Sequence, residues 1–254
     1  MANERYIVEQ LSEHLIVVGQ AITPAMPPTA DGNLYLIAGP EGILSVDAGA
    51  GTSFPFVLAA LARYGYADLP LRVVLLTHEH WDHAWGLPEF RQRGATIACT
   101  SPVAAALPGL FEATVDRILA PGPHHLAGYD VEVVPTPGHT PSSTTFRIAV
   151  DGAVCLFTGD TITEDGGLGY CGSEGFSRVD LLASLRSLAA LPPAQRYLPG
   201  HLLAPSFSED PSDVLARGIA RGEAGLWTDD WPERKKRLAA ALLDGYRDAR
   251  RALG

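Results

Sequence analysis

The stretch Val73-Val74-Leu75-Leu76-Thr77-His78-Glu79-His80-Trp81-Asp82-His83 decides how the rest of the chain is interpreted. It begins with an apolar run typical of a buried strand and ends with three histidines and an aspartate in six positions. On extended backbone, residues i and i+2 point to the same side, so His78 and His80 can face one ion. Asp82 and His83 follow where the chain must turn into its next element. The spacing therefore predicts a metal site at the end of a strand.

Three segments farther along the chain repeat this arrangement in simpler form. In each, a strand-like run is followed by a glycine and then by a candidate metal ligand. The segments are Val131 to His139, Ala153 to Asp160 and Tyr197 to His201. Glycine permits the sharp turn that a ligand at a strand end requires. Four strand ends are therefore expected to deliver five histidines and two aspartates to one edge of a sheet.

In this order, the four segments resemble the metallo-β-lactamase superfamily of dinuclear metallohydrolases, in its glyoxalase II and lactonase-like branch. The resemblance covers residues 15–205, and Ile43 to Gly49 is also similar to the family's strand-Asp-Gly element. It implies an α/β fold, an αββα sandwich in which two mixed β-sheets lie face to face with helices outside. In that element Asp47 would support the His-rich loop, either by holding a ligand imidazole through its second N–H or as a turn-capping residue.

The resemblance also implies the ligand roles and the chemistry. The implied ligands of one ion are His78, His80 and His139, those of the other are Asp82, His83 and His201, and Asp160 bridges the two. A set of imidazoles and carboxylates suits two divalent ions, Zn²⁺ first, with Fe or Mn as alternatives. The implied reaction is attack by a metal-bridging hydroxide on an ester, lactone or thioester, with Asp82 orienting the hydroxide and passing on its proton.

The bulk properties favour one catalytic domain with a short extension. The chain has 254 residues, 46% of them hydrophobic, and its candidate ligands span residues 78–201 without a linker. We expect a catalytic domain at residues 1–205 and a C-terminal helical extension, residues 206–254, packed on the same domain. The charged, amphipathic tail is compatible with a homodimer, a question that the sequence leaves open.

Charge and composition restrict the partners. A net charge of −10 disfavours nucleic acid, so a small-molecule substrate is expected. The sequence has no apolar run of membrane-spanning length, no signal-peptide pattern and only three widely spaced cysteines. We therefore expect a cytoplasmic protein without a membrane partner.

Periodicity and turn residues place the remaining elements. Strands are expected at Tyr6–Val18, Leu34–Val46, Thr96–Cys99, Val131–Val134, Thr144–Val150 and Ala153–Phe157. Helices are expected at Phe54–Tyr64, Asp82–Arg93, Val179–Ala190, Pro211–Arg221 and Glu233–Ala252.

The substrate is the least determined part of the prediction. Asp160 disfavours a true β-lactamase, since subclasses of that group have Cys or Ser there. The sequence also lacks, at Ser173-Glu174-Gly175-Phe176, the Lys and Tyr with which glyoxalase II binds glutathione. The alternatives are a persulfide-dioxygenase-like enzyme with one iron on His78, His139 and Asp160, and a non-catalytic metal-binding protein on the same fold.

Two segments are candidates for contact with an apolar acyl group. Residues 21–32 form either a loop over the site, with Met26 near its apolar tip, or an ordinary surface turn. Residues 165–175 form a glycine-rich loop that carries Tyr170 and either folds over the site or lies on the surface. Phe176 is the next candidate, and Trp81 and Trp85 are others, although Trp85 is equally compatible with the core.

Overall fold

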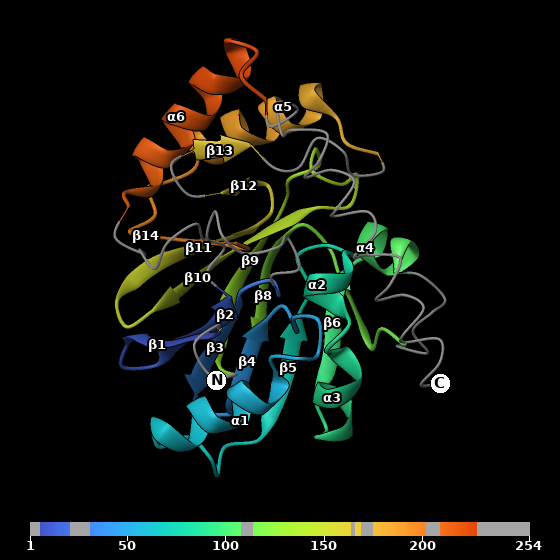
Figure 1. Cartoon of the computed structure of the whole chain (residues 1–254), viewed down its shortest axis with the longest axis vertical. Coiled ribbons are helices and arrows are strands. Elements are labelled where there is room, and N and C mark those ends of the chain that lie inside the picture. The colour runs from blue at the N-terminus through green and yellow to red at the C-terminus, as the bar shows by residue number, and fades with distance from the viewer. Residues whose placement is uncertain are drawn as a thin grey trace.

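The computed structural model of the chain describes residues 6–20, 31–107, 114–163, 166–168, 175–201 and 209–227. Two β-sheets pack face to face, and helices cover the outer face of each (Figure 1). This order of layers is the αββα sandwich implied by the resemblance, so the predicted fold class is confirmed.

The first sheet has seven strands in sequence order. They are β1 (Tyr6–Ser12), β2 (Leu15–Gln20), β3 (Leu34–Gly39), β4 (Gly42–Val46), β5 (Leu71–Leu75), β6 (Thr96–Thr100) and β7 (Arg117–Leu119). Strands β1 to β4 are antiparallel and β4 to β7 are parallel, so the sheet is mixed. The helices on its outer face are α1 (Phe54–Arg63), α2 (Trp81–Ala84), α3 (Leu87–Gln92) and α4 (Ser101–Ala106).

The second sheet has five strands. Their order is β14 (Arg196–Pro199), β11 (Ala153–Gly159), β10 (Thr144–Val150), β9 (Tyr129–Pro135) and β8 (Gly122–Leu126). Helices α5 (Arg178–Ala189) and α6 (Pro211–Glu223) cover it, beside a small sheet of β12 (Ile162–Thr163) and β13 (Gly167–Leu168). Because β9, β11 and β14 run in the same direction, their carboxyl ends lie at one edge.

Three apolar clusters hold the four layers together. Side chains of a strand alternate between its two faces, so one strand can serve two clusters. In β4, Leu44 and Val46 pack between the sheets, whereas Ile43 packs under the helices of the first sheet. The third cluster lies between the second sheet and α5 and α6, and includes Leu181 and Val214. The described part of the expected extension, α6, therefore packs on the second sheet.

The structure corrects three predicted elements. The strands expected at Tyr6–Val18 and Leu34–Val46 are each a hairpin, because the chain reverses between Ser12 and Leu15 and between Gly39 and Gly42. The helix expected at Asp82–Arg93 is divided into α2 and α3. Gly86 lies at this break, where its N–H donates to Gly49 O (2.8 Å) and a Cβ would lie 2.0 Å from Ala48 O. This contact with a neighbouring loop interrupts the helix.

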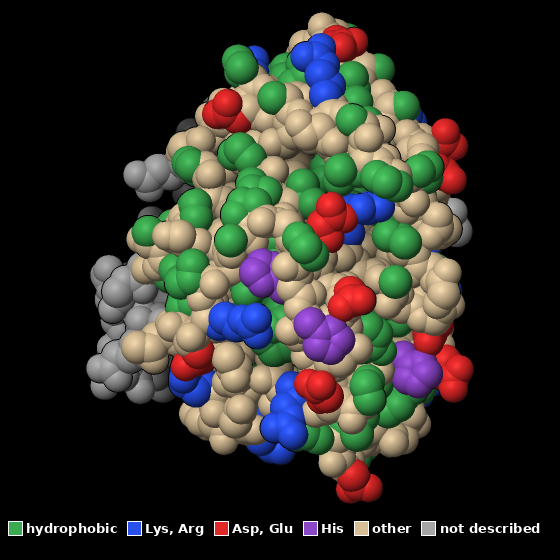
Figure 2. All heavy atoms as spheres, turned by 180° about the vertical axis from the view of Figure 1, so that it is seen from behind, with side chains coloured by type: hydrophobic (Ala, Val, Ile, Leu, Met, Phe, Trp, Pro, Cys, Tyr) green, Lys and Arg blue, Asp and Glu red, His purple; other side chains and the backbone are tan. Residues whose placement is uncertain are grey.

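Some of the predictions concern residues outside the described ranges. The helix expected at Glu233–Ala252, Met26 and Tyr170 are among them, and the division into residues 1–205 and 206–254 stays a prediction. No helix in the ranges described above is long and apolar enough to cross a membrane. On the face turned away from the viewer of Figure 1, Lys and Arg side chains lie apart from one another with acidic side chains between them (Figure 2).

Candidate metal centre

The strand ends of both sheets meet at one end of the sandwich and carry the candidate ligands. The His-rich loop leaves β5 of the first sheet and continues into α2. The other three ligands, His139, Asp160 and His201, follow β9, β11 and β14 of the second sheet. The prediction that all the ligands lie at the edge of one sheet was therefore wrong. They come from the strand ends of both sheets, which meet at this end of the sandwich.

The structure brings all seven predicted ligands together in two neighbouring groups. The first group is His78, His80, His139 and Asp160, and the second is Asp82, His83 and His201. Within each group one ligand atom per residue lies within 4.8 Å of the others. This division agrees with the one implied by the resemblance, although the binding of metal by these residues stays a prediction.

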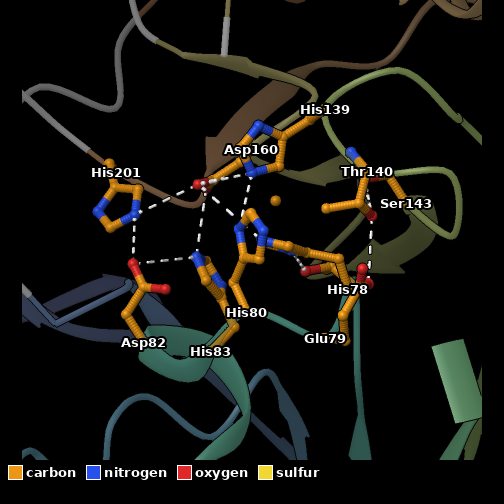
Figure 3. Close-up of polar contacts among 12 residues, drawn as sticks. His78, Glu79, His80, Asp82, His83, His139, Thr140, Ser143, Asp160 and His201 are labelled. Atoms are coloured by element: carbon orange, nitrogen blue, oxygen red, sulfur yellow. Dashed lines mark hydrogen bonds and ion pairs between the residues drawn. The ribbon is translucent and has the colours of Figure 1, made fainter. Parts of the chain in front are cut away.

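Asp160 lies between the two groups (Figure 3). Its Oδ2 is 3.5 Å from His139 Nε2 and 3.4 Å from His201 Nε2, and its Oδ1 is 3.3 Å from His83 Nε2. A single carboxylate thus faces imidazoles of both groups: Oδ1 faces His83 Nε2, and Oδ2 faces the ring nitrogens of His139 and His201. This is the position that a bridging ligand requires.

The donor atoms fit divalent metal ions. Among the described residues, His78 Nε2, His83 Nε2 and Asp160 Oδ1 are buried and make no hydrogen bond. Two ligand atoms that bind a tetrahedral zinc ion are about 3.4 Å apart. The separations between ligand atoms are 3.3 to 3.5 Å around Asp160, and His80 Nδ1 lies 3.0 Å from His139 Nε2, a distance that also allows a hydrogen bond. Buried nitrogen and oxygen atoms that make no hydrogen bond are otherwise costly, and metal ions would satisfy them.

A third group of possible ligands, Glu13, His14 and Asp151, differs in this respect. His14 Nδ1 lies 2.6 Å from Asp151 Oδ1, which is a hydrogen-bond distance and is too short for two ligands of one ion. The backbone N–H of His14 also donates a hydrogen bond to Asp151 Oδ2 (2.9 Å). The pair therefore joins the β1–β2 turn to the β10–β11 turn.

The electrostatics divide the imidazoles into two kinds. Burial lowers the pKa of His139 to about 3, and burial with neighbouring imidazoles holds the pKa of His78 well below 6.5. Burial also acts to lower the pKa values of His83 and His201, but the carboxylates of Asp160 and Asp82 outweigh it. The pKa of His201 rises to about 10, and that of His83 rises well above its ordinary value. Without metal, His78 and His139 are therefore neutral at pH 7, whereas His83 and His201 are protonated.

Metal uptake should therefore release protons. A cation binds an imidazole nitrogen only after its proton leaves, so zinc titration at pH 7.5 should release about one proton each from His83 and His201. Isothermal titration calorimetry in buffers of different ionisation enthalpy counts these protons. His201→Gln should lower the count by about one proton, because the raised pKa of about 10 keeps the His201 ring protonated at pH 7.5. An unchanged count in His201→Gln would contradict this assignment.

Asp47 holds two of the ligand imidazoles in place from outside the ligand groups. Its Oδ2 lies 2.8 Å from His83 Nδ1, the nitrogen that faces away from the ligand groups. Thr77 donates its N–H to Asp47 Oδ1 (2.8 Å) and its hydroxyl to Oδ2 (2.8 Å), and the same hydroxyl lies 3.0 Å from His78 Nδ1. One buried carboxylate thereby fixes an imidazole of each group, one directly and one through Thr77.

The other candidate residues pack against aromatic neighbours or lie outside the described ranges. Trp85 is buried in the core, with its ring centroid 5.8 Å from that of the half-buried Trp81. Phe176 is half-buried and packs edge-on against Trp227, at 6.1 Å between ring centroids, in the cluster under α5 and α6. The contact of Phe176 with substrate stays a prediction, as do those of Met26 and Tyr170.

Two residues just before β3, Gly32 and Asn33, also hold the centre, and sequence reasoning missed them. Gly32 N–H donates to Asp82 O (3.0 Å), and Asn33 N–H donates to Gly200 O (2.7 Å). The Asn33 amide also donates to Pro199 O (3.1 Å), across a separation of 166 residues. These bonds join the loop of Asp82 to the loop of His201. The sequence holds no local signal for them, because they depend on how the two sheets pack.

Comparisons with known proteins agree with this geometry. The model of the metallo-beta-lactamase superfamily matches residues 28–201. Hydroxyacylglutathione hydrolases of Albidiferax ferrireducens and Acidiphilium cryptum are 35% and 37% identical over 181 residues, which is 69% of this chain. A probable polyketide biosynthesis zinc-dependent hydrolase of Bacillus velezensis is 32% identical over 152 residues, 58% of this chain. The matched part spans 64%, 66% and 62% of these curated relatives.

Solved structures share the fold at lower sequence identity. A metallo-beta-lactamase from Pontibacter korlensis superposes with a TM-score of 0.70 at 18% identity, over 86% of this chain and 99% of that one. A metallo-beta-lactamase from Cronobacter sakazakii gives a TM-score of 0.63 at 21% identity, over 92% and 98%. The superfamily model covers more than half of the sequence, including every candidate ligand, and so this chain belongs to the metallo-beta-lactamase superfamily.

Proposed function

We propose that the chain is a dinuclear, zinc-dependent hydrolase that cleaves an acyl bond, with a thioester as the first candidate substrate and esters and lactones as the others. The observation that carries the proposal is the pair of complete ligand groups with Asp160 between them. Zinc ions bound there would polarise a carbonyl oxygen and lower the pKa of water.

The residues of the chain take distinct roles in this proposal. Asp82 Oδ2 lies 3.0 Å from His201 Nε2. Burial acts to raise the pKa of Asp82, but His83 and His201 outweigh it and keep the carboxyl ionised. The ionised carboxylate could therefore accept a hydrogen bond from the attacking water and orient it. Asp160 fixes the spacing of the two groups, and Asp47 fixes the ring of His83 through its 2.8 Å contact.

The relatives support a thioester. The relatives from Albidiferax ferrireducens and Acidiphilium cryptum are named hydroxyacylglutathione hydrolase, and that from Bacillus velezensis is named a zinc-dependent hydrolase. The sequence nevertheless has Ser173 and Glu174 where a cation would meet the glutathione carboxylates. We therefore propose a thioester whose thiol part is recognised without that cation. The completeness of the second group, Asp82, His83 and His201, favours this hydrolase over an enzyme with a single iron.

A substrate panel tests the proposal. The protein reconstituted with Zn²⁺ is offered one acyl group as a thioester of a small neutral thiol, as a glutathione thioester and as an oxygen ester, together with a homoserine lactone. We expect thiol release from both thioesters, with kcat/KM for the glutathione thioester no higher than for the small-thiol thioester. Cleavage of none of the four, or dioxygen consumption with a persulfide by protein that holds one iron, would overturn the proposal.

A further inference from the structure

Glu79 lies between two ligands of the first group, yet its side chain serves neither of them directly. On extended backbone its side chain points to the side opposite those of His78 and His80. Figure 3 shows the Glu79 carboxylate beneath Thr140, beside the imidazoles. Glu79 Oε2 accepts hydrogen bonds from Ser142 Oγ and from Thr140 Oγ1 (3.2 Å). We name these two bonds the Glu79 link.

The partners of Glu79 belong to the turn that carries His139. Thr140 follows His139 directly and is fully buried, and Ser142 is 5% exposed. The Thr140 N–H donates to Ser143 Oγ (3.1 Å), and the hydroxyls of Thr140 and Ser143 are 3.0 Å apart. These bonds give the turn a fixed shape with two hydroxyl protons directed at one carboxylate. Hydrogen bonds to a charged acceptor are about twice as strong as neutral ones.

The first ligand group needs such a link because it is divided between the two sheets. His78 and His80 follow β5 of the first sheet, whereas His139 follows β9 of the second. The core between the sheets is apolar, and apolar contact does not by itself fix a lateral position to a fraction of an ångström. A hydrogen bond between the two loops is directional and can fix that position. The backbone bond from Thr144 N–H to Thr77 O (2.9 Å) anchors the base of the same junction.

The second ligand group has a separate link. Gly32 and Asn33 join the loop of Asp82 to the loop of His201 through backbone bonds. Each group is therefore held across the sheet junction by its own hydrogen bonds. A defect in one link should affect one group.

We propose that Glu79 is a positioning residue that sets the distance between the His78–His80 pair and His139, and thereby the affinity of the first metal site alone. The proposal rests on the proposed function, since it presupposes that the two groups bind metal. Neighbours that orient metal ligands affect affinity by about 10–100-fold when they are removed.

Metal titration of single variants tests this directly. Zinc is titrated into the metal-free protein in competition with a chromogenic chelator, and the two dissociation constants are resolved. Variants His139→Ala and His201→Ala assign each constant to a group. Glu79→Ala should weaken the first site by about 10–100-fold and leave the second unchanged. Glu79→Gln, which keeps one acceptor oxygen, should recover part of the loss. The control is Glu132→Ala, which removes a carboxylate from β9, the strand that leads to His139, and it should change neither dissociation constant.

A double-mutant cycle shows whether Glu79 acts through the hydroxyls. Thr140→Val with Ser142→Ala should weaken the same site, and adding Glu79→Ala should add little, because the three changes break one link. Equal loss at both sites, or additive losses, would overturn the positioning role. A wild-type protein that binds no zinc would instead overturn the proposed function, so the two failures are distinguishable. Circular dichroism spectra check that each variant is folded.

Discussion

Asp160→Ala should lose both metal ions and almost all activity, the largest effect that we expect from any single substitution. The Asp160 carboxylate is within 3.5 Å of a ring nitrogen on three imidazoles, and these belong to both groups. Without it, each group loses a negative ligand and the two cations lose the charge that lies between them. We expect a fall in kcat/KM of more than about 100-fold, the upper range for losing an outer neighbour of a metal site.

Elemental mass spectrometry of the purified variant measures the metal content, and a thiol-release assay measures the activity. Asp130→Ala is the matched control, since it removes a largely exposed carboxylate from β9 of the same sheet. It should keep the metal and the activity of the original protein. Full metal occupancy in Asp160→Ala would refute the bridging position, whatever the activity.

The sequence was sufficient to find the seven residues that the structure brings together, because candidate ligands at strand ends leave a local pattern. His78, His139 and Asp160 each follow an apolar run, and a strand end is a place where chain direction and side-chain direction are both restricted. The resemblance then supplied the division into two groups, which the structure reproduces as two clusters of atoms. The fold class followed from the same resemblance.

What the sequence did not predict depends on contacts between distant segments. The hairpin turn at Glu13 and His14 contains neither glycine nor proline, so the sequence has no strong turn signal between β1 and β2. Asn33 reaches Pro199 only after the sheets have packed. Glu79 was visible inside the His-rich stretch, but its partners, Thr140 and Ser142, come from a turn 61 and 63 residues away.

Gly200→Ala should also abolish tight metal binding, although it removes no ligand. A Cβ at Gly200 would lie 2.2 Å from Asp160 Oδ1 and 2.8 Å from His83 Cε1, distances at which atoms cannot remain. The backbone cannot retreat easily, because Gly200 N–H donates to Gly159 O (2.8 Å) and Gly200 O accepts from Asn33 (2.7 Å). His83 is held from behind by Asp47. The methyl group must therefore displace the Asp160 carboxylate.

We expect the zinc affinity of Gly200→Ala to fall by at least about 100-fold, which is more than the usual effect of removing a residue that orients a ligand. Overpacking should also lower the free energy of unfolding by about 1–3 kcal/mol. Chelator competition measures the first quantity and denaturant unfolding the second. Gly222→Ala is the control on α6, where the nearest atom to the new Cβ is the flexible end of Leu182 at 3.2 Å. Alanine is favoured over glycine inside a helix by about 1 kcal/mol, so this control should retain stability and metal. Wild-type zinc affinity in Gly200→Ala would mean that Asp160 can bind metal from a displaced position, and that the spacing around it does not determine affinity.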